Sequence, residues 1–383
     1  MKLIRNIILI ILGIVLLTAL LPQNIYLLVS FSAILLAILP YNRRWNNSTY
    51  TLLLFSVFYS VMIVLSGQVQ SWFLVISYLI TPVAFFRLGQ YLMFVFKDDD
   101  KRFRLLLFIA FCYLINVFIL VLVDIREVGI VNVERVISSN QTQNSSLAAT
   151  LYGLMLSFGI GSIAGCLSRN QPALIRILYA ALFALSLLSV IHFVNRGGLI
   201  ISLIALFVAI ILMTKKQKNY ILLFSILFLF CFFALNYSEL ISQDVITAYE
   251  YRNDVTGYGI MTAGGRIDRW SMYMKDLLTH PLGWSQNLYG HNLWLDLARA
   301  GGWLPLFPFL LVSFRVFRNT VYLMRFSKNP FTITLVVLNL SLIIASSLEP
   351  VIEGSMLFFS ILILVWGMID YLCYGGRTNI MTK

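Results

Sequence analysis

Arginine and histidine side chains set among glycines between apolar runs are the residues of this sequence best suited to chemistry on an anionic group. The stretch VIHFVNRGGLI, residues 190–200, places His192 one helical turn before Arg196, so the two side chains can share a face. A guanidinium binds anionic oxygens in a fork geometry. Arg196 is therefore a candidate anion ligand and His192 a candidate substrate contact. The alternative is an arginine that snorkels to the membrane interface.

A second group of candidates lies in AGGRIDRWSMYMKDLLTHPLGW, residues 263–284. An amphipathic helix is predicted over about 266–278, and His280-Pro281 is predicted to end it, because the residue before proline disfavours helical geometry. Arg266, Arg269 and Tyr273 fall on one stripe of that helix. Two arginines close to a helix N-terminus favour an anion site. The alternative is a surface helix whose arginines pair with the neighbouring aspartates, Asp268 and Asp276.

The third group is in GHNLWLDLARAGGW, residues 290–303. His291 follows a glycine at a predicted helix start, and imidazole is the side chain suited to proton transfer near neutral pH. Asn292, Asp296 and Arg299 recur at helical spacing and predict one polar stripe running into a membrane helix at 291–314. Asp296 can pair with Arg299 one turn on, and that pair can be purely structural.

Acidic residues offer few further candidates. Glu349 and Glu353, in SLEPVIEGS, bracket a short step between two apolar segments. They could orient an arginine or histidine, or be loop acids. Asp98–Asp100 is interpreted as a solvated charge cluster.

The sequence has three histidines, no cysteine cluster and no HExxH, CxxC, GxSxG or Walker motif, so neither a metal nor a cofactor is predicted.

The elements that must position these residues are membrane helices. The chain has 383 residues, of which 60% are hydrophobic and 11% charged, whereas a soluble domain has about 25% charged residues. We predict an all-α integral membrane protein that forms a single transmembrane domain over 1–383. About twelve apolar segments can be drawn, at 3–21, 25–40, 50–66, 72–95, 105–124, 147–167, 176–194, 197–213, 221–238, 291–314, 330–347 and 355–373.

The distribution of lysine and arginine predicts the orientation of these helices. With both termini in the cytoplasm, most of the 28 basic residues fall on the cytoplasmic side. The net charge of +12 is therefore an orientation signal and does not favour nucleic-acid binding. All the candidate groups then lie on the outer side, together with a long loop at about 239–290 that is predicted to hold short amphipathic helices.

The order of these motifs resembles the O-antigen polymerase and O-antigen ligase superfamily of GT-C-like integral membrane glycosyltransferases. The similarity is concentrated in about 190–311: an Arg-Gly at a membrane helix, a long outer loop with GR…W and then HPLGW, and finally HNLWLDLARAGGW leading into an apolar segment. THPLGW and HNLWLDLARAGGWLPLFPFLL are the most specific pieces.

The resemblance implies a bacterial inner-membrane enzyme whose active site faces the periplasm. Family members transfer a glycan from undecaprenyl pyrophosphate to an acceptor hydroxyl. Arg196 and Arg266 match the pyrophosphate-binding arginines and His291 matches the essential histidine. Arg269, Tyr273 and Asn292 are predicted to contact substrate, as are His192, Glu349 and Glu353. The implied partners are the lipid-linked oligosaccharide, membrane lipid and a chain-length regulator protein.

Three functions stay open at this point. A polymerase transfers the growing glycan to a new lipid-linked repeat unit; it is favoured by the short chain and by NLYG, where related ligases carry a second histidine before the HN pair. A ligase transfers the glycan to lipid A–core or, in related enzymes, to protein. A flippase or other transporter of lipid-linked oligosaccharide would instead have charged groups deep in several helices, accessible from both sides.

Overall fold

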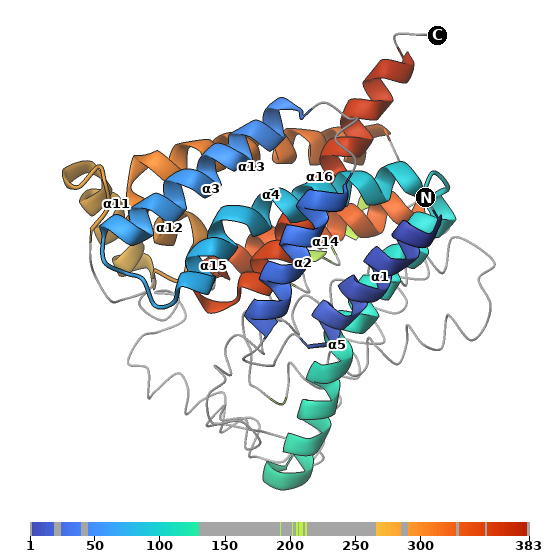
Figure 1. The fold of residues 1–383 in the computed structure, drawn as a ribbon, viewed down its shortest axis with the longest axis horizontal. Helices are drawn as coiled ribbons and strands as arrows, with labels where there is room; N and C mark the ends of the chain where they lie inside the picture. Colours follow the sequence, from blue (N-terminus) through green and yellow to red (C-terminus); the bar gives the residue numbers. More distant parts are fainter. Residues whose placement is uncertain are drawn as a thin grey trace. The chain divides into compact units, whose positions relative to one another are not determined.

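The computed structural model describes residues 2–18, 24–39, 45–129, 266–284, 290–326, 329–348 and 351–380, with scattered positions from 192 to 212 (Figure 1). These residues form helices and their connections, with no strand among them. The helices are α1 Lys2–Leu17, α2 Asn24–Ile38, α3 Asn47–Leu65, α4 Trp72–Val95, α5 Asp99–Val128, α11 Arg266–Thr279, α12 Leu293–Gly301, α13 Trp303–Phe326, α14 Pro330–Leu348, α15 Val351–Gly354 and α16 Met356–Ile380.

Within the described part of the chain, five helices are long and apolar enough to cross a membrane: α3, α4, α13, α14 and α16. Helices α1 and α2 are apolar but shorter. The all-α, multi-pass character expected from the sequence is confirmed at this level. The predicted segments at 147–167 and 221–238, and most of 176–194 and 197–213, lie outside the described residues, so the number twelve stays a prediction.

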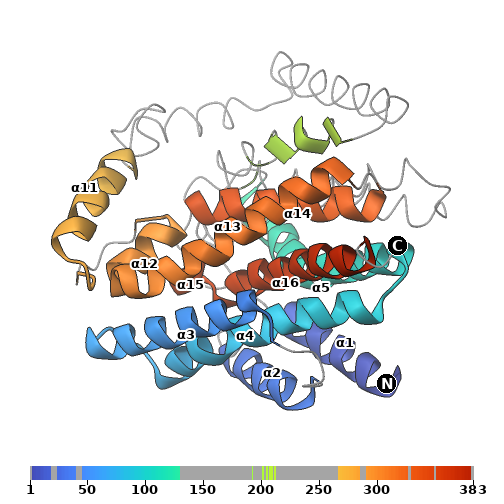
Figure 2. The same ribbon diagram turned by 90° about the horizontal axis from the view of Figure 1, so that it is seen from above.

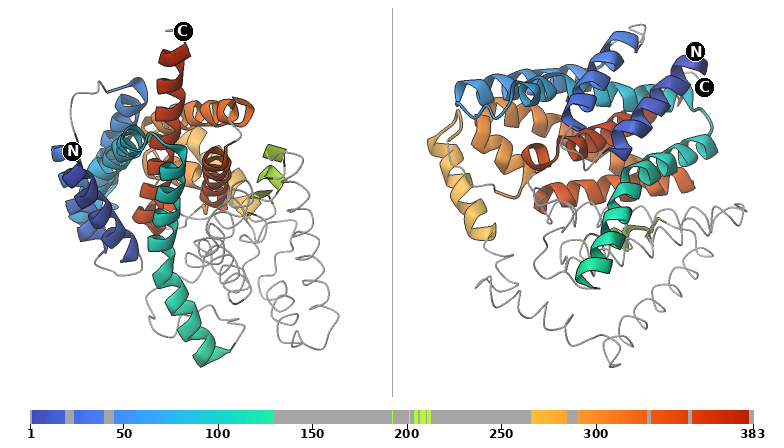
Figure 3. Two further views of the ribbon diagram at one scale, coloured as in Figure 1. Left: turned by 90° about the vertical axis from the view of Figure 1, so that its right-hand side faces the viewer. Right: turned by 60° about the horizontal axis from the view of Figure 1, so that its bottom comes forward.

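The chain divides into two compact units. The first comprises Met1–Tyr113, Arg269–Phe326 and Ser346–Lys383; the second comprises Leu114–Asp268 and Ser327–Ala345. In the first unit, α4 packs against α3, α2 and α16, and α13 packs against α3 and α16 (Figure 2). Helix α2 also contacts α1, as two further views show (Figure 3).

Two glycines allow α4 and α16 to approach backbone to backbone. A β-carbon on Gly89 would lie 2.1 Å from the Leu364 carbonyl oxygen, and one on Gly367 would lie 2.1 Å from the Phe86 carbonyl oxygen. Small residues at a helix crossing permit this close contact, which membrane helices use because the hydrophobic effect does not drive their association.

A buried carboxylate joins three helices of the same unit near the start of α3. Asp370 of α16 accepts hydrogen bonds from the side chains of Asn46, Ser48 (2.9 Å) and Gln90 (2.9 Å), and it is 6% exposed. Its donors come from α4, from the first turn of α3 and from the residue that caps α3. A buried charge is tolerated only with such partners. Asp370 is therefore a structural link between helices.

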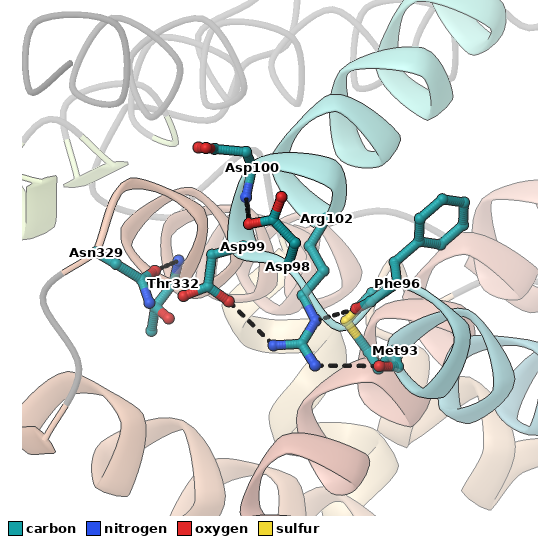
Figure 4. A network of polar contacts seen from close by, with 8 residues as sticks. All are labelled: Met93, Phe96, Asp98, Asp99, Asp100, Arg102, Asn329 and Thr332. Atoms are coloured by element: carbon teal, nitrogen blue, oxygen red, sulfur yellow. Dashed lines mark hydrogen bonds and ion pairs between the residues drawn. The ribbon is translucent and has the colours of Figure 1, made fainter.

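The acidic run at the start of α5 serves the helix ends around it (Figure 4). Arg102 donates to the Phe96 and Met93 carbonyl oxygens at 2.6 and 3.1 Å, at the C-terminal end of α4, and pairs with Asp99 at 3.0 Å. Asp98 accepts from the Asp100 N–H at 3.2 Å and is exposed. This geometry agrees with the interpretation of Asp98–Asp100 as a surface charge cluster.

The continuous membrane helix predicted at 291–314 is wrong. The chain forms α12 over Leu293–Gly301, breaks at Gly302 with φ of 63°, and begins the long helix α13 at Trp303. Backbone hydrogen bonds hold the break: the Trp303 N–H donates to the Pro281 carbonyl at 2.9 Å, and the Trp284 N–H donates to the Arg299 carbonyl at 2.9 Å. The polar stripe of Asn292, Asp296 and Arg299 therefore belongs to a short helix that precedes the long apolar one.

We expect Gly89→Ala and Gly367→Ala each to destabilise the protein by about 1–3 kcal/mol or more, because the added methyl group would overlap backbone that cannot move independently. The unfolding temperature of the purified protein measures this effect. Gly13→Ala is the matched control, since its β-carbon would meet side chains and no backbone: the Phe108 ring at 3.0 Å and Cys112 Sγ at 3.7 Å. An unchanged unfolding temperature in both variants would contradict the close helix contact.

Candidate functional site

The candidate site is built from α11, the connection that follows it, and α12. Helix α11 spans Arg266–Thr279 and ends before His280-Pro281, which confirms the predicted helix and its stop. Its apolar side is anchored by Tyr273 and Leu277, which are buried with Trp284, Ala298 and Leu306 in one cluster. The Tyr273 and Trp284 rings meet edge to face with centroids 5.4 Å apart. This cluster fixes α11 against α12.

His291 stands in an unusual backbone conformation at the start of α12. Its φ of 51° makes it the one non-glycine residue with positive φ in the described part of the chain. This region costs an L-residue about 1–2 kcal/mol, although histidine tolerates it better than most. A strained residue persists only where its surroundings determine its conformation.

Hydrogen bonds to the residues on both sides of His291 hold its backbone in this conformation. The Gly290 N–H donates to Asp296 Oδ1 at 2.6 Å, and the Asn292 N–H donates to Asp296 Oδ2 at 3.3 Å. The Gly290 carbonyl accepts from Trp270 Nε1 of α11 at 2.7 Å. A β-carbon on Gly290 would lie 3.0 Å from the Tyr273 ring, so the backbone sits directly on that ring. The backbone is thus held on either side of a half-buried imidazole.

Asn292 begins α12 and has its side chain committed to structure. Its Oδ1 accepts from the Trp294 and Leu295 N–H groups at 3.1 and 3.3 Å, as expected of an N-cap. Its Nδ2 donates to the Ser347 carbonyl oxygen at 3.4 Å.

Asp296 and Arg299 form a buried pair one turn into α12. Arg299 Nε lies 3.9 Å from Asp296 Oδ1, and the side chains are 4% and 1% exposed. Burial raises the pKa of the Asp296 carboxyl above its ordinary value. The Gly290 and Asn292 N–H bonds and the charges of Arg299 and His291 oppose that shift without overcoming it. Burial likewise raises the pKa of Tyr273.

Of the residues singled out in the sequence, Tyr273, His291 and Asn292 come together here with the Asp296–Arg299 pair. Arg269 lies one turn before Tyr273 on α11, and both Arg266 and Arg269 are half-buried. The division between the two units falls within α11, after Asp268. Arg196 and Glu349 lie outside the described residues. Glu353 belongs to α15, and its side chain is outside the described part.

His192 has a partner that sequence reasoning missed. Its Nε2 lies 2.7 Å from Asp124 Oδ2 in the second unit, and neither side chain is more than 1% exposed. Trp270 was also missed as a site residue, although it is the tryptophan of the GR…W motif. Its role depends on a contact with Gly290, twenty positions away, which local periodicity cannot reveal.

What the described arrangement can do chemically is present one imidazole from a backbone that is held by Asp296, a buried acid that also pairs with Arg299. Among the described residues, no three histidine, cysteine, aspartate or glutamate side chains are grouped so that they could hold a metal ion.

We expect Asp296→Ala to destabilise the protein by roughly 3 kcal/mol. The substitution leaves the buried Gly290 N–H without its acceptor and Arg299 without its carboxylate. The unfolding temperature reports the effect, with exposed Asp268→Ala as the control, for which a change within about 0.5 kcal/mol is expected. Equal stability of the two variants would mean that Asp296 does not hold the His291 backbone.

Because the pKa of Asp296 is raised, we also expect the stability of the protein to depend on pH. The folded chain binds this proton more tightly than the unfolded chain, so the free energy of unfolding rises as pH falls from above the raised pKa towards the ordinary value of 3.8. Asp296→Asn cannot titrate at this position. The stability of the unaltered protein relative to this variant should therefore be greater at about pH 4.5 than at pH 8. The same difference at both pH values would contradict the assignment.

A scan of the sequence against protein-family models finds no match, and a search of curated proteins finds no similar sequence either.

Proposed function

We propose that this chain is a metal-independent membrane glycosyltransferase of the O-antigen polymerase type, acting on undecaprenyl-pyrophosphate-linked glycan at the periplasmic face of the inner membrane. The observation that carries the proposal is the fixed His291 backbone at the start of α12, held by buried Asp296, which also pairs with Arg299. The motif resemblance makes His291 the essential histidine of such an enzyme.

The chemistry requires a base and a means to stabilise a leaving group. The acceptor hydroxyl attacks the anomeric carbon, its proton passes to His291, and the bond from the anomeric carbon to the phosphate oxygen breaks. The departing pyrophosphate gains negative charge as that bond breaks, so arginines placed around it lower the barrier. Arg196 and Arg266 take this role by resemblance, with Arg269 beside them.

The imidazole must keep one orientation to accept a proton from a hydroxyl bound beside it, since proton transfer needs hydrogen-bond geometry. The Gly290 and Asn292 bonds to Asp296 fix the backbone from which the imidazole extends, which supports such an orientation. Substrate positioning by rigid elements is worth several kcal/mol in catalysis. This accounts for a strained residue at the position that the family motif assigns to the base.

The test is the surface polysaccharide of a deletion strain complemented with variants. We expect His291→Ala, Arg196→Ala and Arg266→Ala to abolish long polysaccharide, with a loss of about 10²–10⁴-fold for the histidine. Exposed His280→Ala and Arg104→Ala are the matched controls and should restore wild-type polymer. Long polymer in the His291→Ala strain, with normal protein abundance, would reject the proposed role of this residue.

The same gels separate the alternatives. A polymerase null leaves lipid A–core carrying a single repeat unit. A ligase null leaves bare core and polymer on the lipid carrier. Lipid-linked repeats confined to the cytoplasmic leaflet would instead indicate a flippase. The NLYG sequence before His291 favours the polymerase over the ligase.

A further inference from the structure

A small pocket lies where the connection between α3 and α4 meets α12, within the first unit. Its volume is about 250 Å³, and residues 67–71 of the connection form much of its lining. Arg299 of α12 lines the same pocket. Apart from Arg299, the lining residues lie outside the group of side chains around His291.

The connection is built as a defined turn. Gly67 has φ of 69°, its N–H donates to the Val64 carbonyl at 3.2 Å, and the Gln68 N–H donates to the Ile63 carbonyl at 3.2 Å. These bonds close the end of α3 in the way that a glycine in left-handed conformation commonly does. Ser71 then caps α4 by accepting from the Phe73 N–H at 3.2 Å. The backbone that forms this wall of the pocket is therefore held by hydrogen bonds, which fixes the Cα positions of the lining residues.

The lining combines polar groups with an apolar wall. Gln68 and Gln70 contribute amides, Ser71 and Tyr78 contribute hydroxyls, and Leu74 and Val75 contribute hydrocarbon surface. Amides and hydroxyls both donate and accept hydrogen bonds. This is the combination that matches a sugar ring, which has hydroxyls at its edge and C–H groups on its faces.

The charge of the lining has one sign. Arg299 is charged, and none of the lining residues is acidic. Asp296 pairs with Arg299 from outside the pocket lining, and its two oxygens accept the Gly290 and Asn292 N–H groups. A guanidinium in a pocket with no acidic lining residue favours an anion, and it forms strong hydrogen bonds with a carboxylate.

We infer that this pocket binds one acidic monosaccharide unit, a sugar bearing a carboxylate, of the glycan substrate. Arg299 binds the carboxylate, Gln68 and Gln70 bind ring hydroxyls, and Leu74 and Val75 contact a ring face. The volume is below the range of about 300–1,000 Å³ usual for drug-sized ligands, which suits one sugar unit of the glycan. The inference rests on the proposed function for the identity of the ligand as part of a glycan.

Binding of glucuronate, glucose and inorganic pyrophosphate to the purified full chain in lipid nanodiscs tests the inference, for example by ligand-observed NMR. The chain should bind glucuronate, a ligand of one sugar unit, with a dissociation constant of about 1 mM. Glucose should bind about tenfold more weakly or worse, because it lacks the charged group. Arg299→Gln should weaken glucuronate binding about tenfold or more, whereas exposed Arg104→Gln should leave it unchanged.

A second pair of variants avoids the buried Asp296–Arg299 pair. Gln68→Glu adds a negative charge to the solvent-accessible turn and should weaken glucuronate binding about tenfold while sparing glucose. Gln68→Met, of similar size and uncharged, should have a smaller effect on glucuronate. Equal glucuronate binding by Gln68→Glu and the unaltered chain would overturn the inference.

Two further outcomes would also overturn it: no glucuronate binding, or Arg299-dependent binding of pyrophosphate with which glucuronate does not compete. The second would make the pocket a phosphate site. These results are separable from those on the proposed function. If His291→Ala abolishes polymer but glucuronate does not bind, only the pocket assignment fails. If glucuronate binds as expected but polymer is normal in the His291→Ala strain, only the glycosyltransferase proposal fails.

Discussion

Two backbone N–H groups, from Gly290 and Asn292, converge on the buried carboxylate of Asp296, and the geometry around His291 depends on that convergence. Hydrogen bonds to a charged group contribute about 1.5–3 kcal/mol each, which offsets the 1–2 kcal/mol that a left-handed residue costs. The same carboxylate faces Arg299, so one buried acid determines both the conformation of the histidine and the position of the cation. Trp270 extends this control to α11 through the Gly290 carbonyl.

The helices beneath the site give it a rigid base. Helix α12 packs against α3 and α13, and α3 packs on α4, which meets α16 at Gly89 and Gly367. Asp370 ties α3, α4 and α16 together near the start of α3. A site on helices that are fixed by backbone contact and by a buried polar link keeps its geometry better than one on loops alone. Two buried acids among the described residues of this unit, Asp296 and Asp370, therefore have different roles. Asp296 shapes the site, and Asp370 joins the helices that support it.

Sequence reasoning recovered the parts of the structure that depend on neighbouring residues. The apolar period, the arginine stripe and His280-Pro281 predicted α11 to within a residue at its C-terminal end, because helix boundaries follow local rules. The spacing of Asp296 and Arg299 also predicted their pairing. The prediction of one continuous membrane helix at 291–314 is wrong. The chain breaks at Gly302 because this residue contacts residues 281 and 283, and a local sequence pattern does not encode those contacts. The pairing of His192 with Asp124 and the meeting of Arg299 with the α3–α4 turn were unpredictable for the same reason: each joins residues far apart in the chain.

The contact between Gly283 and Gly302 restricts which residues a homologous sequence can have at these two positions. A β-carbon on Gly302 would lie 2.0 Å from the Pro281 carbonyl oxygen, and one on Gly283 would lie 2.8 Å from the Arg299 carbonyl oxygen. Both glycines also have positive φ, so neither position accepts another residue without rearranging the chain. A diverged homologue that keeps this junction must retain both glycines, even where its apolar helices have drifted beyond detection. The spacing of these two glycines on either side of the His291-Asn292 pair is thus a better sign of common ancestry than overall sequence identity.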